Sequence, residues 1–284
     1  VIVEDNSNSN PLDSGKNILY YLFWTKDSKL KQDLSDLQTK LMLSDEQMNQ
    51  LKTIGLNQFK ENQRFKTNQL LNNALNKSYI KTYNAAIKTE AEDTNQAMKS
   101  VLNQDYSAFR DWIGKWWQNE KNYRNNLVLQ NADDKFKVNA NIKKHIIYAT
   151  QYNPNTSGAR EVALPDKYVK FANLGWDDTY SNPPYTVTIR SSAGTLSNVE
   201  VDDVGPWNEN DNYWDSNRRE FGDLTVGTPE AYAAYENNYN NGEDEFGRTV
   251  TNPAGIDLSP AAAKAIGLGT YESGWIEVTF SKLP

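Results

Sequence analysis

Residues 199–206 read Val-Glu-Val-Asp-Asp-Val-Gly-Pro, and this stretch decides the predicted fold of the second half of the chain. Its valines alternate with acidic residues, which is the period of a strand with one apolar face. The Gly-Pro pair ends the strand, because proline has no amide hydrogen and glycine suits a turn. Asp203 has the parity of Val199 and Val201, so we expect its carboxylate to continue the apolar face, partly desolvated, at the strand end.

Further strand-like segments, separated by Gly, Pro and Asn clusters, surround this stretch. They are residues 146–151, 167–172, 185–190, 198–203 and 275–281. One short helix is expected among them: Ser259 can cap it, Pro260 suits its first turn, and Gly267 can end it. The second half of the chain is therefore predicted to be mainly β.

The first half of the chain has a helical pattern with little Gly or Pro. Ser44 and Gln47 have the spacing of a capping box, in which each side chain binds the other's backbone amide. Trp112, Trp116 and Trp117 lie on a helical stripe, which favours a helical core over a partner or membrane surface. We expect three or four helices, one of which could run long through residues 65–89.

The length of 284 residues allows two domains. The predicted class is α+β, with a flexible terminus at 1–13, a helical domain at 14–126, a boundary at 127–143 and a barrel domain at 144–284. The barrel carries a long insertion at residues 207–254.

Composition excludes several classes of function. The net charge of −7 argues against a broad nucleic-acid footprint, which needs a basic surface. Cysteine is absent and His145 is the single histidine, which excludes thiolate sites and sites that need two imidazoles. No apolar run is long enough to span a membrane. The chain starts at Val1 rather than Met, which suggests a removed leader or an artificial start, and the polar residues that follow resemble a flexible mature terminus. Of the two, we favour the leader, and hence a secreted protein.

Three segments, in order and spacing, resemble the double-psi β-barrels of the rare lipoprotein A and expansin type. They are residues 149–154 (Ala-Thr-Gln-Tyr-Asn-Pro), residues 199–206, and residues 255–263 (Gly-Ile-Asp-Leu-Ser-Pro-Ala-Ala-Ala). The resemblance covers about half of the chain and implies a six-stranded barrel in a secreted or envelope protein. Family members include lytic transglycosylases of peptidoglycan, expansins and some endoglucanases, together with barrels without known catalysis and protease inhibitors.

The resemblance implies that Asp203 is the catalytic acid, since it occupies the aspartate position of the second motif. A partly desolvated carboxylate can donate a proton to the leaving oxygen of a glycosidic bond. The alternative is an aspartate that only accepts amide hydrogen bonds in a turn. Rare lipoprotein A enzymes also carry a histidine before their second strand, and it is missing here. Asp177 or Asp178 could supply a second carboxylate there.

Aromatic residues in the insertion are candidates for substrate binding. Trp207, Tyr213 and Trp214 stand among Asn and Asp residues, and such rings stack on sugar faces while amides and carboxylates bind hydroxyls. The alternative is a loop that packs its own aromatic rings. The further substrate-binding candidates are Trp176, Tyr180 and Asp257.

No cofactor and no metal are predicted. Phosphate loops, dinucleotide fingerprints and zinc helices are missing from the sequence. The asparagine-rich run from Asn208 resembles a calcium loop, but Tyr213 and Arg219 stand where that loop needs glycine and glutamate.

Two functions from different classes follow. In the first, the barrel binds a cell-wall polysaccharide such as peptidoglycan or a β-glucan, and cleaves or loosens it. In the second, a non-catalytic interaction or inhibitor protein uses the barrel as scaffold and the helical domain to bind a protein partner.

Overall fold

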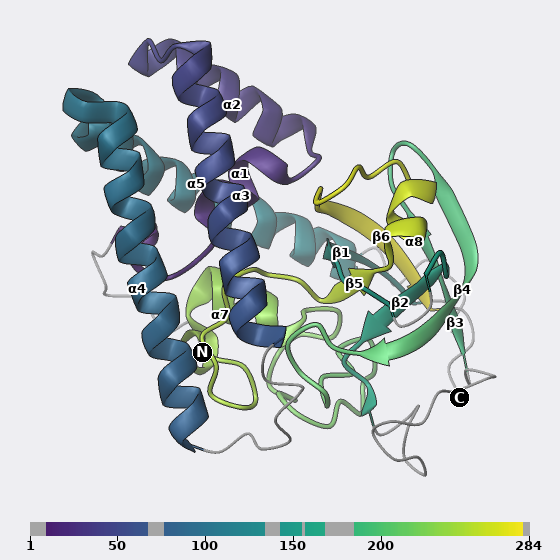
Figure 1. The fold of residues 1–284 in the computed structure, drawn as a ribbon. Coiled ribbons are helices and arrows are strands. Elements are labelled where there is room, and N and C mark those ends of the chain that lie inside the picture. The colour runs from purple at the N-terminus through teal and green to yellow at the C-terminus, as the bar shows by residue number, and fades with distance from the viewer. Residues whose placement is uncertain (1–9, 68–76, 134–142, 155–156, 168–184, 281–284) are drawn as a thin grey trace. The chain divides into compact units, whose positions relative to one another are not determined.

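The computed structural model describes residues 10–67, 77–133, 143–154, 157–167 and 185–280. The chain divides into two compact units: Val1–Tyr123 with Ala234–Asn252, and Arg124–Ala233 with Pro253–Pro284. A helical region is followed by a closed six-stranded β-barrel (Figure 1), so the predicted α+β class is confirmed. Residues 234–252, which belong to the expected insertion, group with the helices of the first unit.

Helices form most of the first unit, and local sequence signals mark where they begin and end. They are α1 (Ile18–Trp24), α2 (Ser28–Leu41), α3 (Asp45–Thr67), α4 (Lys77–Leu102) and the greater part of α5 (Tyr106–Asp133). Asp27 caps α2 by accepting the Leu30 amide, and the left-handed Met42 ends it. The predicted capping box of α3 is confirmed, with Ser44 and Gln47 binding each other's amides at 2.9 and 3.2 Å.

Aromatic and aliphatic side chains fill the core of this unit. Tyr20 of α1 stacks on Phe59 of α3 with ring centroids 3.8 Å apart. Gly55 lies where the two helices meet, and a β-carbon there would come within 2.8 Å of the Leu19 backbone. Trp116 and Trp117 of α5 are buried, so the prediction that this stripe forms a helical core is confirmed.

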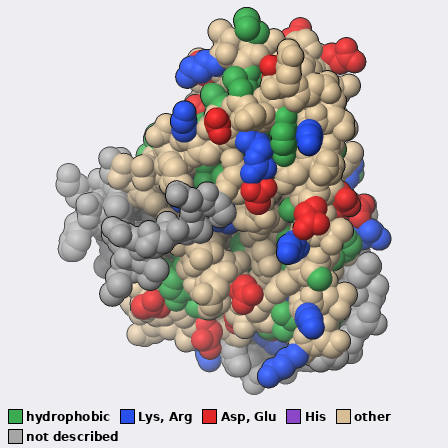
Figure 2. All heavy atoms as spheres, turned by 90° about the vertical axis from the view of Figure 1, so that its left-hand side faces the viewer, with side chains coloured by type: hydrophobic (Ala, Val, Ile, Leu, Met, Phe, Trp, Pro, Cys, Tyr) green, Lys and Arg blue, Asp and Glu red, His purple; other side chains and the backbone are tan. Residues whose placement is uncertain are grey.

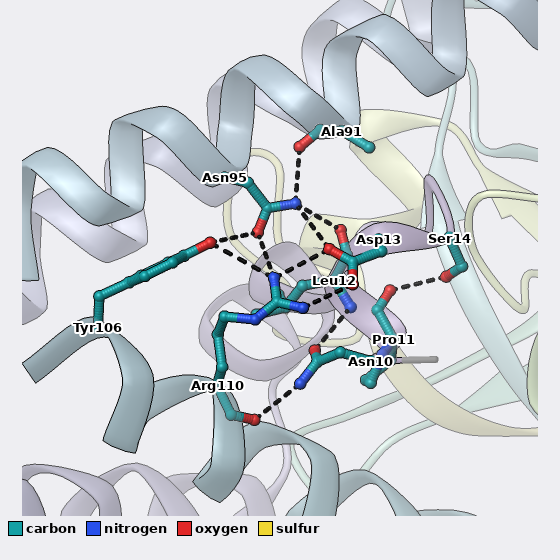
Figure 3. A network of polar contacts seen from close by, with 9 residues as sticks. All are labelled: Asn10, Pro11, Leu12, Asp13, Ser14, Ala91, Asn95, Tyr106 and Arg110. Carbon is teal, nitrogen blue, oxygen red and sulfur yellow. Dashed lines mark hydrogen bonds and ion pairs between the residues drawn. The ribbon is translucent and has the colours of Figure 1, made fainter. Parts of the chain in front are cut away.

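A polar network fastens the start of the described chain to α4 and α5 (Figure 3). Residues 10–13 were expected to be part of a flexible terminus, but they form η1 (Pro11–Asp13) and its Asn10 cap. Arg110 of α5 binds the Asp13 carboxylate through both terminal nitrogens, at 2.9 and 2.5 Å. Asn95 of α4 donates to the Leu12 carbonyl at 3.1 Å.

The barrel closes in the order β1-β5-β2-β4-β3-β6. Its strands are β1 (Lys143–Gln151), β2 (Glu161–Leu164), β3 (Thr186–Arg190), β4 (Thr195–Val204), β5 (Ile256–Leu258) and β6 (Gly274–Phe280). The pairs β1–β5 and β2–β4 are parallel and the other four pairs are antiparallel. Four of the strands agree with the sequence prediction, whereas β2 and β5 were not predicted, and the segment 167–172 lies largely outside the described residues.

The barrel core consists of the inward-facing members of each strand. Val187, Val201, Ile256 and Val278 are examples, and each is at most 1% exposed. The short helix α8 (Pro260–Ala265) adds Ala262 and Ala263 to this core. Its predicted signals are confirmed: Ser259 accepts the Ala262 amide, Pro260 opens the helix, and Gly267 follows with a φ of +81°.

The surface offers no large patch of a single kind on the face drawn in Figure 2. Among the described residues coloured there, basic and acidic side chains are interspersed and hydrophobic ones are scattered. Within the ranges that the structure describes, no helix combines the length and apolar character that a membrane crossing requires.

Candidate functional site

A row of four residues crosses neighbouring strands on the outer side of the barrel. Thr150 of β1 pairs with Asp257 of β5, Asp257 pairs with Ala163 of β2, and Ala163 pairs with Asp203 of β4. Ala149 and both chain neighbours of Ala163 and Asp257 belong to the barrel core, so alternation along these strands turns the row outward, and Asp203 is itself exposed. Two of the predicted site residues, Asp203 and Asp257, thus lie in one row with the small Ala163 between them.

A β-bulge in β4 places Asp203 in this row. The prediction that Asp203 shares a face with Val199 and Val201 is therefore wrong. Val162 pairs with Val201, but Ala163 pairs with Asp203, which leaves Asp202 as an extra residue in β4. The extra residue reverses the alternation, so Asp203 leaves the apolar face and is exposed. Its carboxylate accepts the Val204 amide at 2.7 Å. Asp203 is therefore open to solvent rather than partly desolvated.

Tyr152 and Glu161 complete the site beside the row. Tyr152 follows Thr150 by two residues and Glu161 precedes Ala163 by two, so both share the outward face. The Tyr152 hydroxyl donates to the Glu161 carboxylate at 2.8 Å. Glu161 itself is buried, and its amide donates to the Ser259 hydroxyl at 3.2 Å. Glu161 is thereby held from both its backbone and its side chain.

Three carboxylates are near enough to the Tyr152 hydroxyl to act on its pKa. Burial raises the pKa of Tyr152 most, and the hydrogen bond to Glu161 raises it further. The negative charges of Glu161, Asp203 and Asp257 all act in the same direction on that pKa. The site thus combines one exposed acid, two buried acids and a half-buried phenol.

Asp257 is held in place by the neighbouring strand. It is 9% exposed, and the Thr150 hydroxyl donates a hydrogen bond to its carboxylate. Two steps between strands, of about 4.8 Å each, separate the backbones of Asp257 and Asp203.

Three predicted substrate-binding rings lie elsewhere. Trp207, Tyr213 and Trp214 are only 3%, 0% and 2% exposed, so they do not line an open groove. Trp214 stacks on Phe280, and the Tyr213 hydroxyl donates to the Gly255 carbonyl at 3.1 Å. The alternative, a loop that packs its own aromatic rings, describes the structure, because burying such rings stabilises the barrel more than exposing them.

The other predicted site residues lie outside the described ranges. They are Asp177, Asp178, Trp176 and Tyr180, within residues 168–184. His145 is buried in β1, with its ring near those of Tyr213 and Phe280. Among the described residues, no group of His, Cys, Asp or Glu is arranged to hold a metal ion.

Sequence reasoning missed Glu161, and used Thr150 and Tyr152 only as part of a motif. The two-residue spacing of Thr150 and Tyr152 is a signal for a shared strand face. Glu161 carries no such signal, because β2 has only four residues and all of them are buried. Its role depends on strands that are distant in sequence.

Comparisons with known proteins bear on the barrel. No curated protein and no solved structure is significantly similar to the chain. Residues 135–279, which include all six strands apart from the last residue of β6, match a family described as a domain of unknown function. The match covers half of the chain, and the protein therefore belongs to the DUF8814 family.

Proposed function

We propose that the outer face of the barrel binds a cell-wall or other β-linked polysaccharide beside Asp203, and that Asp203 is the general acid that cleaves or loosens it. The observation that carries the proposal is the row that places Asp203 and Asp257 on either side of Ala163, with Glu161 hydrogen-bonded to Tyr152 beside it. The resemblance of residues 149–154, 199–206 and 255–263 to secreted wall proteins supports the same substrate class. It also supports a location outside the cell.

The carboxylates differ in exposure, and this difference suggests separate roles. Asp203 is exposed and can meet a glycan chain arriving from solvent. Asp257 is buried and oriented by Thr150, so it is suited to stabilise developing positive charge or to direct a water molecule. Two-carboxylate hydrolysis needs a proton donor on one side of the scissile bond and a second carboxylate, acting as base or nucleophile, on the other.

Tyr152 offers an aromatic surface within the site. Its ring is half-buried, and its hydroxyl is committed to Glu161. The exposed part of the ring can stack on a sugar face, the role once expected of Trp207 and Trp214.

The experiment compares binding and product release on insoluble peptidoglycan, cellulose and xylan. Asp203→Asn should still sediment with the polymer that the wild type binds, while product release falls by about 100-fold or more. Glu277→Gln removes a carboxylate from β6, which does not neighbour β2, β4 or β5, and should leave both readouts unchanged. Equal product release by Asp203→Asn and wild type would refute the assignment of the acid.

A second candidate is a non-catalytic scaffold whose helices bind a protein partner. The burial of Tyr213 and Trp214 favours it, because a ring-lined groove is the usual platform for a long glycan. A wild type that neither sediments with the three polymers nor releases product from them would support the scaffold over the enzyme.

A further inference from the structure

We propose that Tyr271 is a stacking platform for the apolar face of a sugar ring, at the end of the barrel where Tyr152 and Glu161 meet. The inference rests on the polysaccharide binding proposed above and assigns to it a residue outside the row of carboxylates. Tyr271 is 44% exposed, and no other large hydrophobic side chain is exposed among the described residues of the second unit.

The backbone holds Tyr271 in a turn position that usually belongs to glycine. Glu272 donates its amide to the Gly269 carbonyl at 3.0 Å, which closes a turn over residues 269–272, between α8 and β6 (Figure 1). Tyr271 is the third residue of this turn, and its φ of +63° lies in the left-handed region that a bulky side chain rarely adopts. Since the exposed ring gains little from burial, the unfavourable backbone points to a role for the side chain outside the protein's own core.

Gln151, at the end of β1, fastens both ends of the turn. Its side-chain amide donates to the Gly269 carbonyl at 2.8 Å and to the Glu272 carbonyl at 2.7 Å. The Glu272 carboxylate accepts the Gly269 amide at 2.7 Å, which ties the turn to itself. Directly after the turn, the Ser273 hydroxyl lies 2.6 Å from the Tyr148 hydroxyl of β1. A ring carried by such a braced turn loses little conformational entropy when a ligand binds.

Gln151 also brings the turn beside the candidate site. It stands between Thr150 and Tyr152, which both belong to that site. A sugar chain that crosses the end of β1 can therefore contact the ring of Tyr271 and the exposed part of Tyr152 in succession. Both rings offer an aromatic face, the surface on which the apolar side of a pyranose stacks.

Sedimentation with insoluble peptidoglycan, cellulose and xylan tests the platform. Tyr271→Ala should bind about tenfold more weakly to the polymer that the wild type binds, because the stacked ring is lost. Tyr271→Phe keeps the ring and should bind as the wild type does. Tyr123→Ala is the matched control, since it removes a tyrosine that is 39% exposed in the first unit, and it should leave binding unchanged.

Thermal unfolding separates a binding role from a structural one. Tyr271→Gly relieves the left-handed backbone, so it should melt at or above the wild-type temperature and still lose binding as Tyr271→Ala does. A residue that only stabilises the barrel would lower the melting temperature and the binding together, and that result would overturn the proposal.

The outcomes also keep this proposal apart from the assignment of Asp203. Asp203→Asn should retain binding and lose product release, whereas Tyr271→Ala should lose binding but release product at the wild-type rate on saturating polymer. Wild-type affinity in Tyr271→Ala would overturn the platform and leave the assignment of Asp203 standing. A wild type that sediments with none of the three polymers would overturn both.

Discussion

Trp214 stacks on Phe280 inside the barrel, with ring centroids 4.6 Å apart and planes inclined by 15°. The two residues are 66 positions apart, and one comes from a loop while the other ends β6. The barrel core is thus completed by a segment that carries no strand of its own, which makes the loop part of the folding unit.

Replacing Trp214 by Ala should lower the free energy of unfolding by about 3–5 kcal/mol, because it leaves a cavity next to Phe280. Urea unfolding followed by near-ultraviolet circular dichroism measures the change. Tyr271→Ala, at a position 44% exposed, should alter stability by less than about 0.5 kcal/mol. A loss of glycan binding without a loss of stability in Trp214→Ala would contradict the buried position of this ring.

Gly55 should resist substitution, since an alanine there must push α1 away from α3. Gly55→Ala is expected to cost about 1–3 kcal/mol, because its β-carbon would lie 2.8 Å from backbone atoms of Leu19 and Tyr20. Gly114→Ala is the matched control in α5, where the nearest atom would be 3.6 Å away. It should be neutral or stabilise by up to about 1 kcal/mol through helix propensity. Thermal unfolding of both variants, read by far-ultraviolet circular dichroism, compares them, and equal melting temperatures would refute the close helix contact.

Glu120 should be needed for the helical unit, because it is fully buried between two donors. The Tyr21 hydroxyl and the Lys29 ammonium each lie 2.7 Å from its carboxylate. Glu120→Ala leaves both donors without this acceptor and should cost about 3–5 kcal/mol. Unfolding in urea at pH 7 measures the loss, and a cost below about 1 kcal/mol would show that the network is dispensable.

The same network predicts a loss of stability in alkali. Burial lowers the pKa of Lys29, but hydrogen bonds to Asp33 and Glu120 outweigh it, so the folded pKa lies above the ordinary 10.5. The contribution of Lys29 is therefore complete below pH 10.5 and disappears as the pH rises through the higher folded value. Urea midpoints measured between pH 9 and 12 should fall more steeply for the wild type than for Lys29→Met. Parallel curves would exclude Lys29 as the responsible group.

The Arg110–Asp13 pair should hold the start of the chain on α4 and α5. Asp13→Asn is expected to cost about 1 kcal/mol, since one bidentate, charge-assisted pair is lost at a partly exposed position. Arg110→Lys keeps the charge but not the two-nitrogen geometry, and should lose a similar amount. A double-mutant cycle from urea unfolding isolates the pair, and a coupling energy near zero would show that the two residues act independently.

Local patterns in the sequence were sufficient for much of the fold. The capping box at Ser44, the cap and end of α8 at Ser259 and Gly267, and the alternation in β6 all depend on residues a few positions apart. Such signals act within one turn or one strand, so no partner segment is needed to recognise them.

The site could be predicted only in part. Asp203 and Asp257 were named from motifs, and the structure brings them into one row. Glu161 was not found, because β2 gains its hydrogen bonds from β4 and β5, which are distant in sequence. Alternation along the strand predicted the wrong face for Asp203. It assumes an unbroken ladder of backbone hydrogen bonds, and the extra residue Asp202 interrupts that ladder.

The sequence by itself determined where most helices and strands lie, because caps and periodicity are short-range properties of the chain. Tertiary structure alone decided that Asp203 faces solvent, that Glu161 joins it, and that Tyr213 and Trp214 fill the barrel. Strand pairing and the burial of rings depend on contacts between distant segments, and their free energy is realised only when the barrel closes.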